Sequence, residues 1–227
     1  MATFIQRLSK ASVTQRSLLC VGLDPDLDEM PIRDVAQFNK EIIGATFDLV
    51  CAYKPNLAFY EALGIPGLQA LRATIDYIRG ISDSVMVIGD GKRGDIGNTS
   101  RAYAKAFFEE WGFDAVTVNA YGGGDSIQPF IEYEDRGVFV WCRSSNPGSG
   151  EFQDLEVMEQ NCGLPLFHKM ASQASNWNHN GNVGLVVGAT YPNDLGAVRG
   201  ICPSMPLLIP GVGAQLADLK ETVVNGT

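Results

Sequence analysis

The sequence predicts an α/β fold built on a parallel sheet, and three observations support this. Seven short apolar runs that end in polar or glycine residues recur along the 227 residues. Each run is apolar at successive positions, as expected of parallel strands that are covered on both faces. Segments with the apolar spacing of amphipathic helices separate the runs, which gives a repeating strand–helix order.

The predicted elements follow one another without a linker, a low-complexity stretch or a change of composition, so we expect a single domain over residues 1–227. The strand candidates are 18–24, 48–56, 85–92, 115–121, 137–146, 183–190 and 207–213. The helical segments are 35–47, 68–80, 99–112, 156–177, 193–200 and 216–223.

Polar and charged residues gather directly after the strand candidates. They are Asp24, Lys54, the segment 90–95, Asn119, Ser145, Thr190 and Gln215. A (β/α)8 TIM barrel builds its active site from such residues at the carboxyl ends of its strands. An open doubly wound sheet would carry the same pattern, so both architectures stay open and the barrel is favoured.

A barrel of this type needs eight strands, whereas the chain reaches Thr227 after the seventh strand and one further helical segment. We therefore expect the eighth strand and helix to be missing and the barrel to be truncated at its C-terminus. Such a barrel would have an open seam between its seventh and first strands, with two unpaired edges.

Charge and hydropathy exclude several classes of function. The net charge of −9 argues against a nucleic-acid interface that works by neutralising phosphates. No run of 18 apolar residues is present, which argues against a membrane-spanning helix. The first 17 residues lack the continuous apolar segment of a signal peptide, so we expect a cytoplasmic protein.

Cysteine and histidine usage restricts the possible chemistry. The five cysteines are widely spaced and form no CxxC motif, which favours reduced core residues over disulfides or a zinc site. They are Cys20, Cys51, Cys142, Cys162 and Cys202. His168 and His179 have no carboxylate or cysteine at metal-ligand spacing, so we expect no metal site. Lysine and aspartate must then supply any reactive groups.

The strongest local signal is the segment IGDGKRGDIGNTS at 88–100. Asp90 and Lys92 are two apart at a strand end and point to the same side, and Asp95 follows beyond the strand. Two carboxylates about 4 Å apart repel by on the order of 4 kcal/mol at an effective dielectric constant near 20, so they need a shared cation. The segment predicts a functional charge cluster; a solvated turn with a surface ion pair is the alternative.

Lys54 and Asp24 also lie at strand ends. Lys54 precedes Pro55, which keeps it extended, so its ammonium either enters the barrel mouth or reaches out to solvent. Asp24 precedes Pro25 and is either a site residue, a turn initiator or a helix N-cap.

Two later loops are candidate binding segments. In PGVGAQ at 210–215, Pro210, Gly211 and Gly213 make either a phosphate-binding loop or a plain tight turn. In SSNPGSGEFQ at 144–153, hydroxyl and amide groups are able to bind a planar polar ligand, and a surface loop is the alternative.

Taken together and in this order, VGLDPD, KPNLAFYE, GDGKRGDIGNTS, SSNPGS, VVGAT and PGVGAQ resemble the orotidine 5′-phosphate decarboxylase family, in particular its longer-looped branch. The resemblance extends from about residue 18 to 215. It implies a TIM barrel that decarboxylates orotidine 5′-monophosphate to UMP in de novo pyrimidine biosynthesis, without a cofactor. It also implies that Lys54, Asp90, Lys92 and Asp95 form the catalytic array, in which Lys92 stabilises and protonates the C6 carbanion.

The resemblance further implies a set of substrate contacts. Asp24 resembles the residue that binds the ribose, Ser145 the serine that binds the pyrimidine, and Gln215 the glutamine that reaches toward phosphate and base. Asn56 is a further possible ligand contact. Asp95, Ile96 and Thr99 resemble residues that family members contribute to the neighbouring subunit, which implies a homodimer with two composite sites.

The sequence departs from the family pattern in two places. The family's phosphate-binding arginine after the eighth strand has no counterpart before Thr227, and Leu216 and Ala217 stand where the branch commonly has glycines. Two other functions remain open at this point. One is a Mg-dependent sugar-phosphate decarboxylase or synthase of the same superfamily, and the other is a non-catalytic nucleotide-binding protein.

Overall fold

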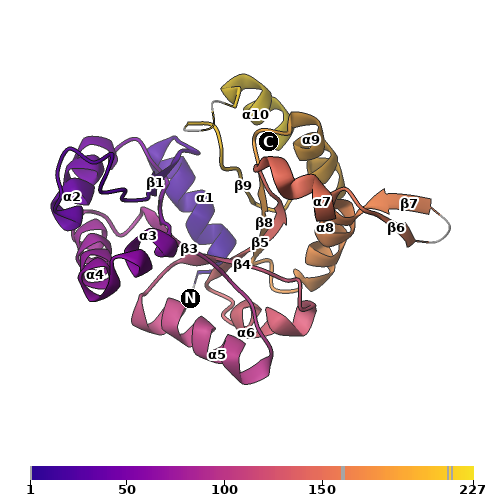
Figure 1. The fold of residues 1–227 in the computed structure, drawn as a ribbon, viewed down its shortest axis with the longest axis horizontal. Helices are drawn as coiled ribbons and strands as arrows, with labels where there is room; N and C mark the ends of the chain where they lie inside the picture. Colours follow the sequence, from indigo (N-terminus) through magenta and orange to yellow (C-terminus); the bar gives the residue numbers. More distant parts are fainter. Residues whose placement is uncertain (1, 160–161, 214, 216) are drawn as a thin grey trace.

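A parallel sheet of seven strands curls through the centre of the molecule (Figure 1). The computed structural model describes residues 2–159, 162–213, 215 and 217–227. The strand order is β1-β2-β3-β4-β5-β8-β9, and all neighbouring strands in it are parallel. Their bounds are β1 Cys20–Leu23, β2 Ala52–Pro55, β3 Met86–Arg93, β4 Ala115–Val118, β5 Gly137–Arg143, β8 Val183–Val187 and β9 Leu207–Leu208. All seven predicted strands are present, which confirms the parallel α/β sheet.

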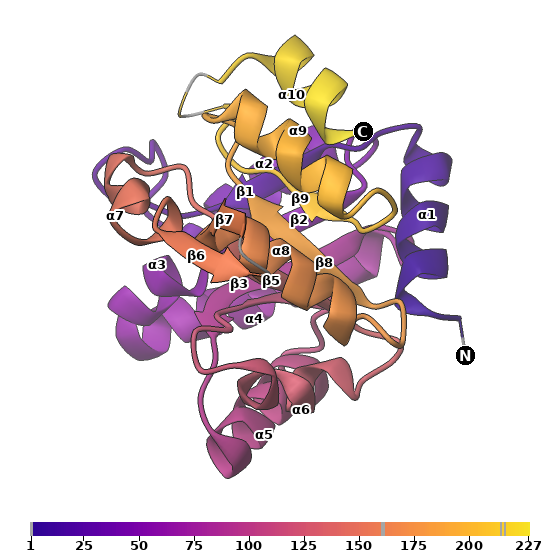
Figure 2. The ribbon, with the colours of Figure 1, turned by 90° about the vertical axis from the view of Figure 1, so that its right-hand side faces the viewer.

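Helices surround the sheet (Figures 1 and 2). They are α1 Phe4–Gln15, α2 Val35–Thr46, α3 Leu57–Ala62, α4 Gly64–Ile81, α5 Gly97–Lys105, α6 Gln128–Ile131, α7 Gly150–Gln153, α8 Leu166–Trp177, α9 Pro192–Ile201 and α10 Leu219–Gly226. A π-helical turn, Ala106–Glu110, extends α5, and two 3₁₀ turns occupy Gly124–Ser126 and Pro147–Ser149.

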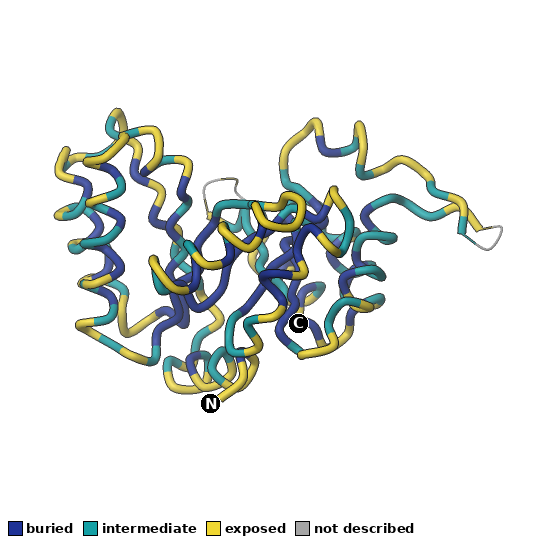
Figure 3. Tube along the Cα trace, turned by 90° about the horizontal axis from the view of Figure 1, so that it is seen from below, coloured by how far each residue is buried: buried dark blue, intermediate teal, exposed yellow. Residues whose placement is uncertain are grey.

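The inner strands β2 to β5 and β8 are largely buried, as their continuous apolar runs predict, whereas the end strands β1 and β9 are mostly half-buried (Figure 3). One face contributes to an inner cluster that includes Ala52, Ile88 and Phe139. The alternate residues, such as Tyr53 and Val87, belong to the larger outer cluster under the helices. This alternation leaves only the strand ends for polar chemistry.

Helix α1 closes the N-terminal end of the strands, an element that the sequence reading does not predict. Thr3 and Gln6 form a capping box at its start. Phe4 packs edge-on against Phe139, with ring centroids 6.0 Å apart. Gly137 allows this approach, because a Cβ there would lie 2.3 Å from the Phe4 ring. Figure 2 shows α1 on the side of the molecule opposite to α3 and α7.

The predicted helix 156–177 is wrong over its first part. Strands β6 (Glu156–Glu159) and β7 (Cys162–Pro165) form an antiparallel hairpin that projects from the body (Figures 1 and 3). Residues 160 and 161 lie outside the described residues. Helix α8 begins directly after Pro165, because proline is tolerated at a helix start and not in its interior.

The hairpin also corrects the prediction for one cysteine. Cys162 is exposed on β7, whereas Cys51, Cys142 and Cys202 are buried and Cys20 is half-buried. All five thiols are free, as predicted.

Strands β1 and β9 form the two ends of the sheet, and no eighth strand pairs with either of them among the described residues. Helix α10 packs against α9 beside β9. Leu216 lies outside the described residues. None of the described helices has the length and apolar character needed to cross a membrane.

Candidate active site

Four of the predicted site residues meet at the carboxyl ends of β1, β2 and β3. Asp24 follows β1, Lys54 lies in β2, and Asp90 and Lys92 lie in β3. The Lys54 Nζ is 2.9 Å from Asp90 Oδ2 and 3.7 Å from Asp24 Oδ1. The Lys92 Nζ is 2.7 Å from Asp90 Oδ1. Acids and bases therefore alternate in one connected chain, and the alternative of a solvated turn does not describe this segment.

Asp90 is the centre of this charge cluster. Its side chain is 8% exposed, and it accepts hydrogen bonds from Lys54, Lys92 and the Thr117 hydroxyl. Burial by itself raises the pKa of Asp90, but the positive charges of Lys54 and Lys92 outweigh burial and lower the pKa to about 2. The carboxylate is thus ionised at neutral pH.

Lys54 is held between the two aspartates. Burial lowers the pKa of Lys54, but the charges of Asp90 and Asp24 reverse this effect and raise the pKa above its ordinary value. The pKa of Asp24 is also raised, because burial outweighs the attraction of Lys54. Since the Lys54 side chain is only 14% exposed, the alternative of an ammonium reaching out to solvent does not hold.

Lys92 lies at an irregularity of β3. Gly89 pairs with Val116 and Arg93 with Val118, so three residues of β3 stand opposite one residue of β4. Lys92 has a φ of +43°, in the left-handed region that non-glycine residues rarely adopt. Its ammonium lies 6.0 Å from the centroid of the Trp141 ring, and the side chain is 34% exposed. The Lys92 ammonium donates one hydrogen bond to Asp90. Its other N–H groups are able to face the mouth of the sheet.

Asp95 lies apart from the charge cluster within this chain. Asp95 and Ile96 are exposed on the segment that joins β3 to α5, and Thr99 is exposed in the first turn of α5. Asp95 Oδ1 accepts a hydrogen bond from the Ile96 N–H at 2.7 Å. Among the described residues it makes no ion pair with Lys92. The segment presents one carboxylate and one apolar side chain to the outside of the chain.

Asn56 and Ser145 follow β2 and β5. Asn56 Oδ1 accepts a hydrogen bond from the Ala58 N–H at the start of α3, and its backbone forms a bridge with Asp90. The carbonyl of Ser145 accepts a hydrogen bond from the Thr190 hydroxyl at 3.2 Å, which ties the loop after β5 to the loop after β8. Both residues are half-buried at the same end of the sheet as Asp90.

The loop after β9 brings Gln215 back over Gly211. The carbonyl of Pro210 accepts a hydrogen bond from the Ala189 N–H at 2.8 Å, which fixes the start of the loop. Gly211 has a φ of +113°, and a Cβ there would lie 2.7 Å from Gln215 Oε1, so this position requires glycine. Gly213 is exposed, and Ala214 lies outside the described residues.

Arg143 is a residue of this end of the sheet that sequence reasoning missed. It is 3% exposed, and its guanidinium forms ion pairs of 2.8 Å with Asp154 and with Asp194. The rings of Phe167 and Tyr191 lie 4.9 and 4.4 Å from it. Arg143 thereby anchors the loop that carries Ser145 to α8 and α9. A signal was present, since an arginine is unusual inside a predicted buried strand.

Thr117 was missed as well. It lies within β4, is 1% exposed, and donates its hydroxyl hydrogen to Asp90 Oδ1 at 2.7 Å. As a β-branched residue in an apolar run, it looks like an ordinary strand residue in the sequence.

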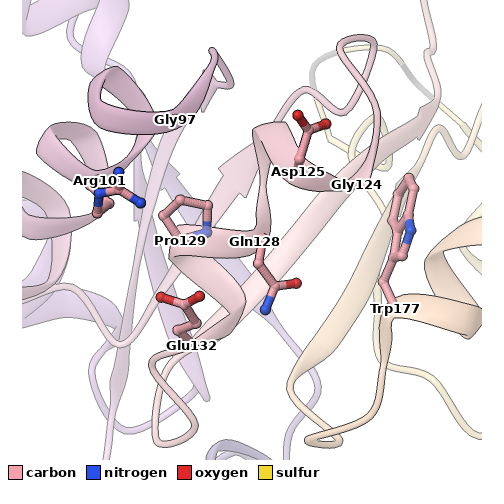
Figure 4. A pocket seen from close by; sticks show the side chains of 8 residues that line it. All are labelled: Gly97, Arg101, Gly124, Asp125, Gln128, Pro129, Glu132 and Trp177. Atoms are coloured by element: carbon pink, nitrogen blue, oxygen red, sulfur yellow. The ribbon is translucent and has the colours of Figure 1, made fainter.

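A hollow of about 530 Å³ lies between α5, α6 and α8, away from the charge cluster (Figure 4). Arg101 and Trp177 stand on opposite sides of it, with Gln128 and Glu132 between them. The candidate site is therefore identified by its cluster of charged residues and not by the size of a hollow. No group of three or more histidine, cysteine, aspartate or glutamate residues in the described part of the chain is placed to hold a metal ion.

Known proteins are similar to this chain in sequence and fold. The family model described as "Orotidine 5'-phosphate decarboxylase / HUMPS family" matches residues 17–227. The orotidine 5′-phosphate decarboxylase of Dehalococcoides mccartyi is 51% identical over 225 residues, which cover 99% of this chain and 82% of that protein. The enzyme of the same name from Thermomicrobium roseum is 52% identical over 231 residues, covering 99% and 80%.

Among solved structures, the OMP decarboxylase of Leishmania donovani superimposes with a TM-score of 0.87 at 37% identity. The match covers 99% of this chain and 84% of that chain. This agreement confirms the predicted barrel class. The chain belongs to the orotidine 5′-phosphate decarboxylase / HUMPS family.

Proposed function

We propose that this chain is a carboxy-lyase that converts orotidine 5′-monophosphate to UMP in pyrimidine biosynthesis. Family membership supports the reaction, and one observation supports the way it proceeds. The Lys92 ammonium is held at the mouth of the sheet by a buried carboxylate that is itself neutralised by Lys54. An ammonium fixed in this way is suited to stabilise negative charge that develops beside it.

The proposed step breaks the bond between C6 of the pyrimidine and its carboxylate. Carbon dioxide leaves, and the electron pair stays on C6, where the Lys92 ammonium offsets its charge. Lys92 then donates a proton to C6, which gives UMP, and regains a proton from solvent. Lysine suits both tasks because its charge is compact and it can release a proton, whereas arginine keeps its proton.

The surrounding residues have proposed binding roles. Asp24 and Lys54 lie at the ribose position, where Lys54 contacts the sugar and orients Asp90. Ser145 binds the pyrimidine, and Asn56 is a further candidate contact. Gln215 binds phosphate and base from the loop that contains Pro210, Gly211 and Gly213. Binding of the remote phosphate then supplies energy that is used in the transition state.

Asp95 needs a second copy of the chain in this proposal. Because it is exposed and unpaired with Lys92 among the described residues, Asp95 is available to a neighbouring subunit, together with Ile96 and Thr99. We propose a homodimer in which each site takes Asp24, Lys54, Asp90 and Lys92 from one subunit and Asp95 from the other.

The function is tested by turnover of orotidine 5′-monophosphate, followed by its change in absorbance, and by calorimetric binding of UMP. Turnover that is unchanged in EDTA supports the proposal, and loss of turnover on chelation supports the magnesium-dependent alternative. Binding of UMP without turnover would make the chain a nucleotide-binding protein and would defeat the proposal.

The shared site is tested by mixing chains that carry Asp24→Asn with chains that carry Asp95→Asn. Each variant alone is inactive in both sites, whereas a mixed dimer has one intact site and one doubly defective site. Random mixing in equal amounts makes about half of the dimers mixed, so about a quarter of wild-type activity is expected. A purified mixed dimer without regained activity would contradict the shared site.

A further inference from the structure

Thr117 connects the two groups on which the proposed chemistry depends. Its hydroxyl oxygen accepts a hydrogen bond from the Lys92 backbone N–H at 3.0 Å. The same hydroxyl donates its hydrogen to Asp90 Oδ1 at 2.7 Å, the oxygen that also accepts from the Lys92 ammonium. One buried hydroxyl thus touches the backbone of the lysine and the carboxylate that holds its side chain.

The irregularity of β3 explains why a hydroxyl is needed at this position. The regular pairing of β3 with β4 stops at Gly89 and resumes at Arg93, so the Lys92 N–H has left the ladder of the sheet. A buried N–H without a partner is costly, and the Thr117 hydroxyl supplies that partner. The hydrogen bond also restrains Lys92 at its φ of +43°, a conformation that a non-glycine residue keeps only when its surroundings enforce it.

The second hydrogen bond fixes the direction of the carboxylate. Asp90 Oδ2 is held by Lys54, and Oδ1 is held by Thr117 and Lys92. Without the hydroxyl, the carboxylate has one constraint fewer on Oδ1 and is freer to follow the flexible Lys92 side chain. A neutral donor from the rigid strand β4 therefore defines where the ammonium sits.

We propose that Thr117 is a positioning residue, which sets the Lys92 ammonium at the reacting carbon by holding both the bulged backbone and the Asp90 carboxylate. This inference rests on the proposed function. It assigns to β4 a part in the reaction, although no residue of β4 touches the substrate in the proposed mechanism.

Three substitutions separate the hydroxyl from the shape of the side chain. Thr117→Val keeps the shape and removes the hydroxyl. Thr117→Ala and Thr117→Ser both remove the methyl group, and only serine keeps the hydroxyl. We expect kcat to fall about 10- to 100-fold in the valine and alanine variants, as for the loss of one hydrogen bond to a charged group, and to stay within about 3-fold in the serine variant. The Kd for UMP should change by no more than about 3-fold in all three, because Thr117 does not touch the ligand.

Thr74→Val is the matched control. Thr74 is equally buried and hydrogen-bonded, to Asn39 and the Ala70 carbonyl, but it lies in α4. This variant should lower the melting temperature and leave kcat unchanged. Valine and alanine variants of Thr117 with the wild-type kcat would overturn the inference, as would a serine variant as slow as the alanine variant, which would indicate a role in packing alone.

A readout without turnover separates this inference from the proposed function. Reductive methylation with ¹³C-formaldehyde labels lysines, and the signal of Lys92 is assigned with Lys92→Arg. We expect this signal to move in the alanine variant and to keep its wild-type position in the serine variant. A Lys92 signal at the same position in the wild type, the alanine variant and the serine variant would contradict the positioning role of Thr117. A wild-type chain without turnover would count only against the proposed function.

Discussion

Two buried aspartates lie at opposite ends of the same sheet and differ in the cations that surround them. Asp90, at the carboxyl end of β3, is bound by Lys54 and Lys92. Asp114, directly before β4, is 1% exposed and forms ion pairs with Arg7, Arg79 and Arg136. Its Oδ2 also accepts a hydrogen bond from the Val87 N–H at 2.7 Å.

The two aspartates differ in the type of cation that binds them: lysines bind Asp90 and arginines bind Asp114. The arginines come from α1, from α4 and from the residue before β5, so Asp114 fastens three parts of the chain at the base of the sheet. Arginine suits this task because it keeps its charge and donates several hydrogen bonds at once; Arg79 also reaches the carbonyls of Val85 and Gly112. In the proposed mechanism, the lysines lie where a compact charge and a transferable proton are needed. This agrees with the general separation of the catalytic end of a barrel from its stabilising end.

The largest expected effect comes from removing the Lys92 ammonium at the carboxyl end of β3. Lys92→Ala should lower kcat by at least about 10⁴-fold, because both electrostatic stabilisation and proton donation are lost. The Kd for UMP should stay within a few-fold, since the product lacks the reacting carboxylate. Steady-state kinetics and calorimetry measure the two quantities. An active Lys92→Ala variant would show that another group donates the proton.

A second, smaller effect is expected from Asp114, at the N-terminal end of the strands. Asp114→Asn leaves three arginines facing one another without their carboxylate, and we expect the free energy of unfolding to fall by about 2 to 4 kcal/mol, less than for fully buried partners because the arginines are partly exposed. Urea unfolding measures this change. The kcat of the folded variant should equal that of the wild type, and a large loss of kcat would contradict the separation of the two ends.

The smallest effect is a pH dependence of stability that belongs to Asp90. Its pKa is about 2 in the folded chain, against about 3.9 in an unfolded chain. A lowered pKa stabilises the fold above the unfolded value, and this contribution is lost as the pH falls from about 4 to about 2. We therefore expect the difference in unfolding free energy between the wild type and Asp90→Asn to be constant from pH 5 to 7. It should shrink by on the order of 2 kcal/mol as the pH is lowered to 2. A constant difference down to pH 2 would contradict the lowered pKa.

The sheet could be predicted from sequence because its inner strands are buried on both faces and the apolar runs are continuous. Helix α1 was missed although its signals exist, since Thr3 and Gln6 form a capping box and Phe4, Leu8 and Ala11 have helical spacing. The predicted helix 156–177 fails before Leu166 because Pro165 cannot lie inside a helix, and the residues before it form the hairpin β6–β7. Whether 1–227 is one truncated domain stays a prediction.

The candidate site was predictable where residue type and strand end coincide, as for Asp24, Lys54, Asp90 and Lys92. Its remaining features depend on register and on distant contacts. Thr117 reaches Asp90 only because β3 bulges opposite it, and Arg143 meets Asp154 and Asp194 only after the loop has folded. A single sequence contains no local signal for the Thr117 contact, and for Arg143 it shows an unusual arginine in a predicted buried strand but not the partners of that arginine.

The left-handed backbone at Lys92 carries a local cost that the charge cluster offsets. Glycine adopts a φ of +43° at little cost, whereas a side chain at such an angle costs on the order of 1 kcal/mol. Lys92→Gly would relieve this strain, but it would also remove one of the two cations that neutralise the buried Asp90 carboxylate. The ammonium of Lys92 thus compensates, through its ion pair, for the strain of its own backbone.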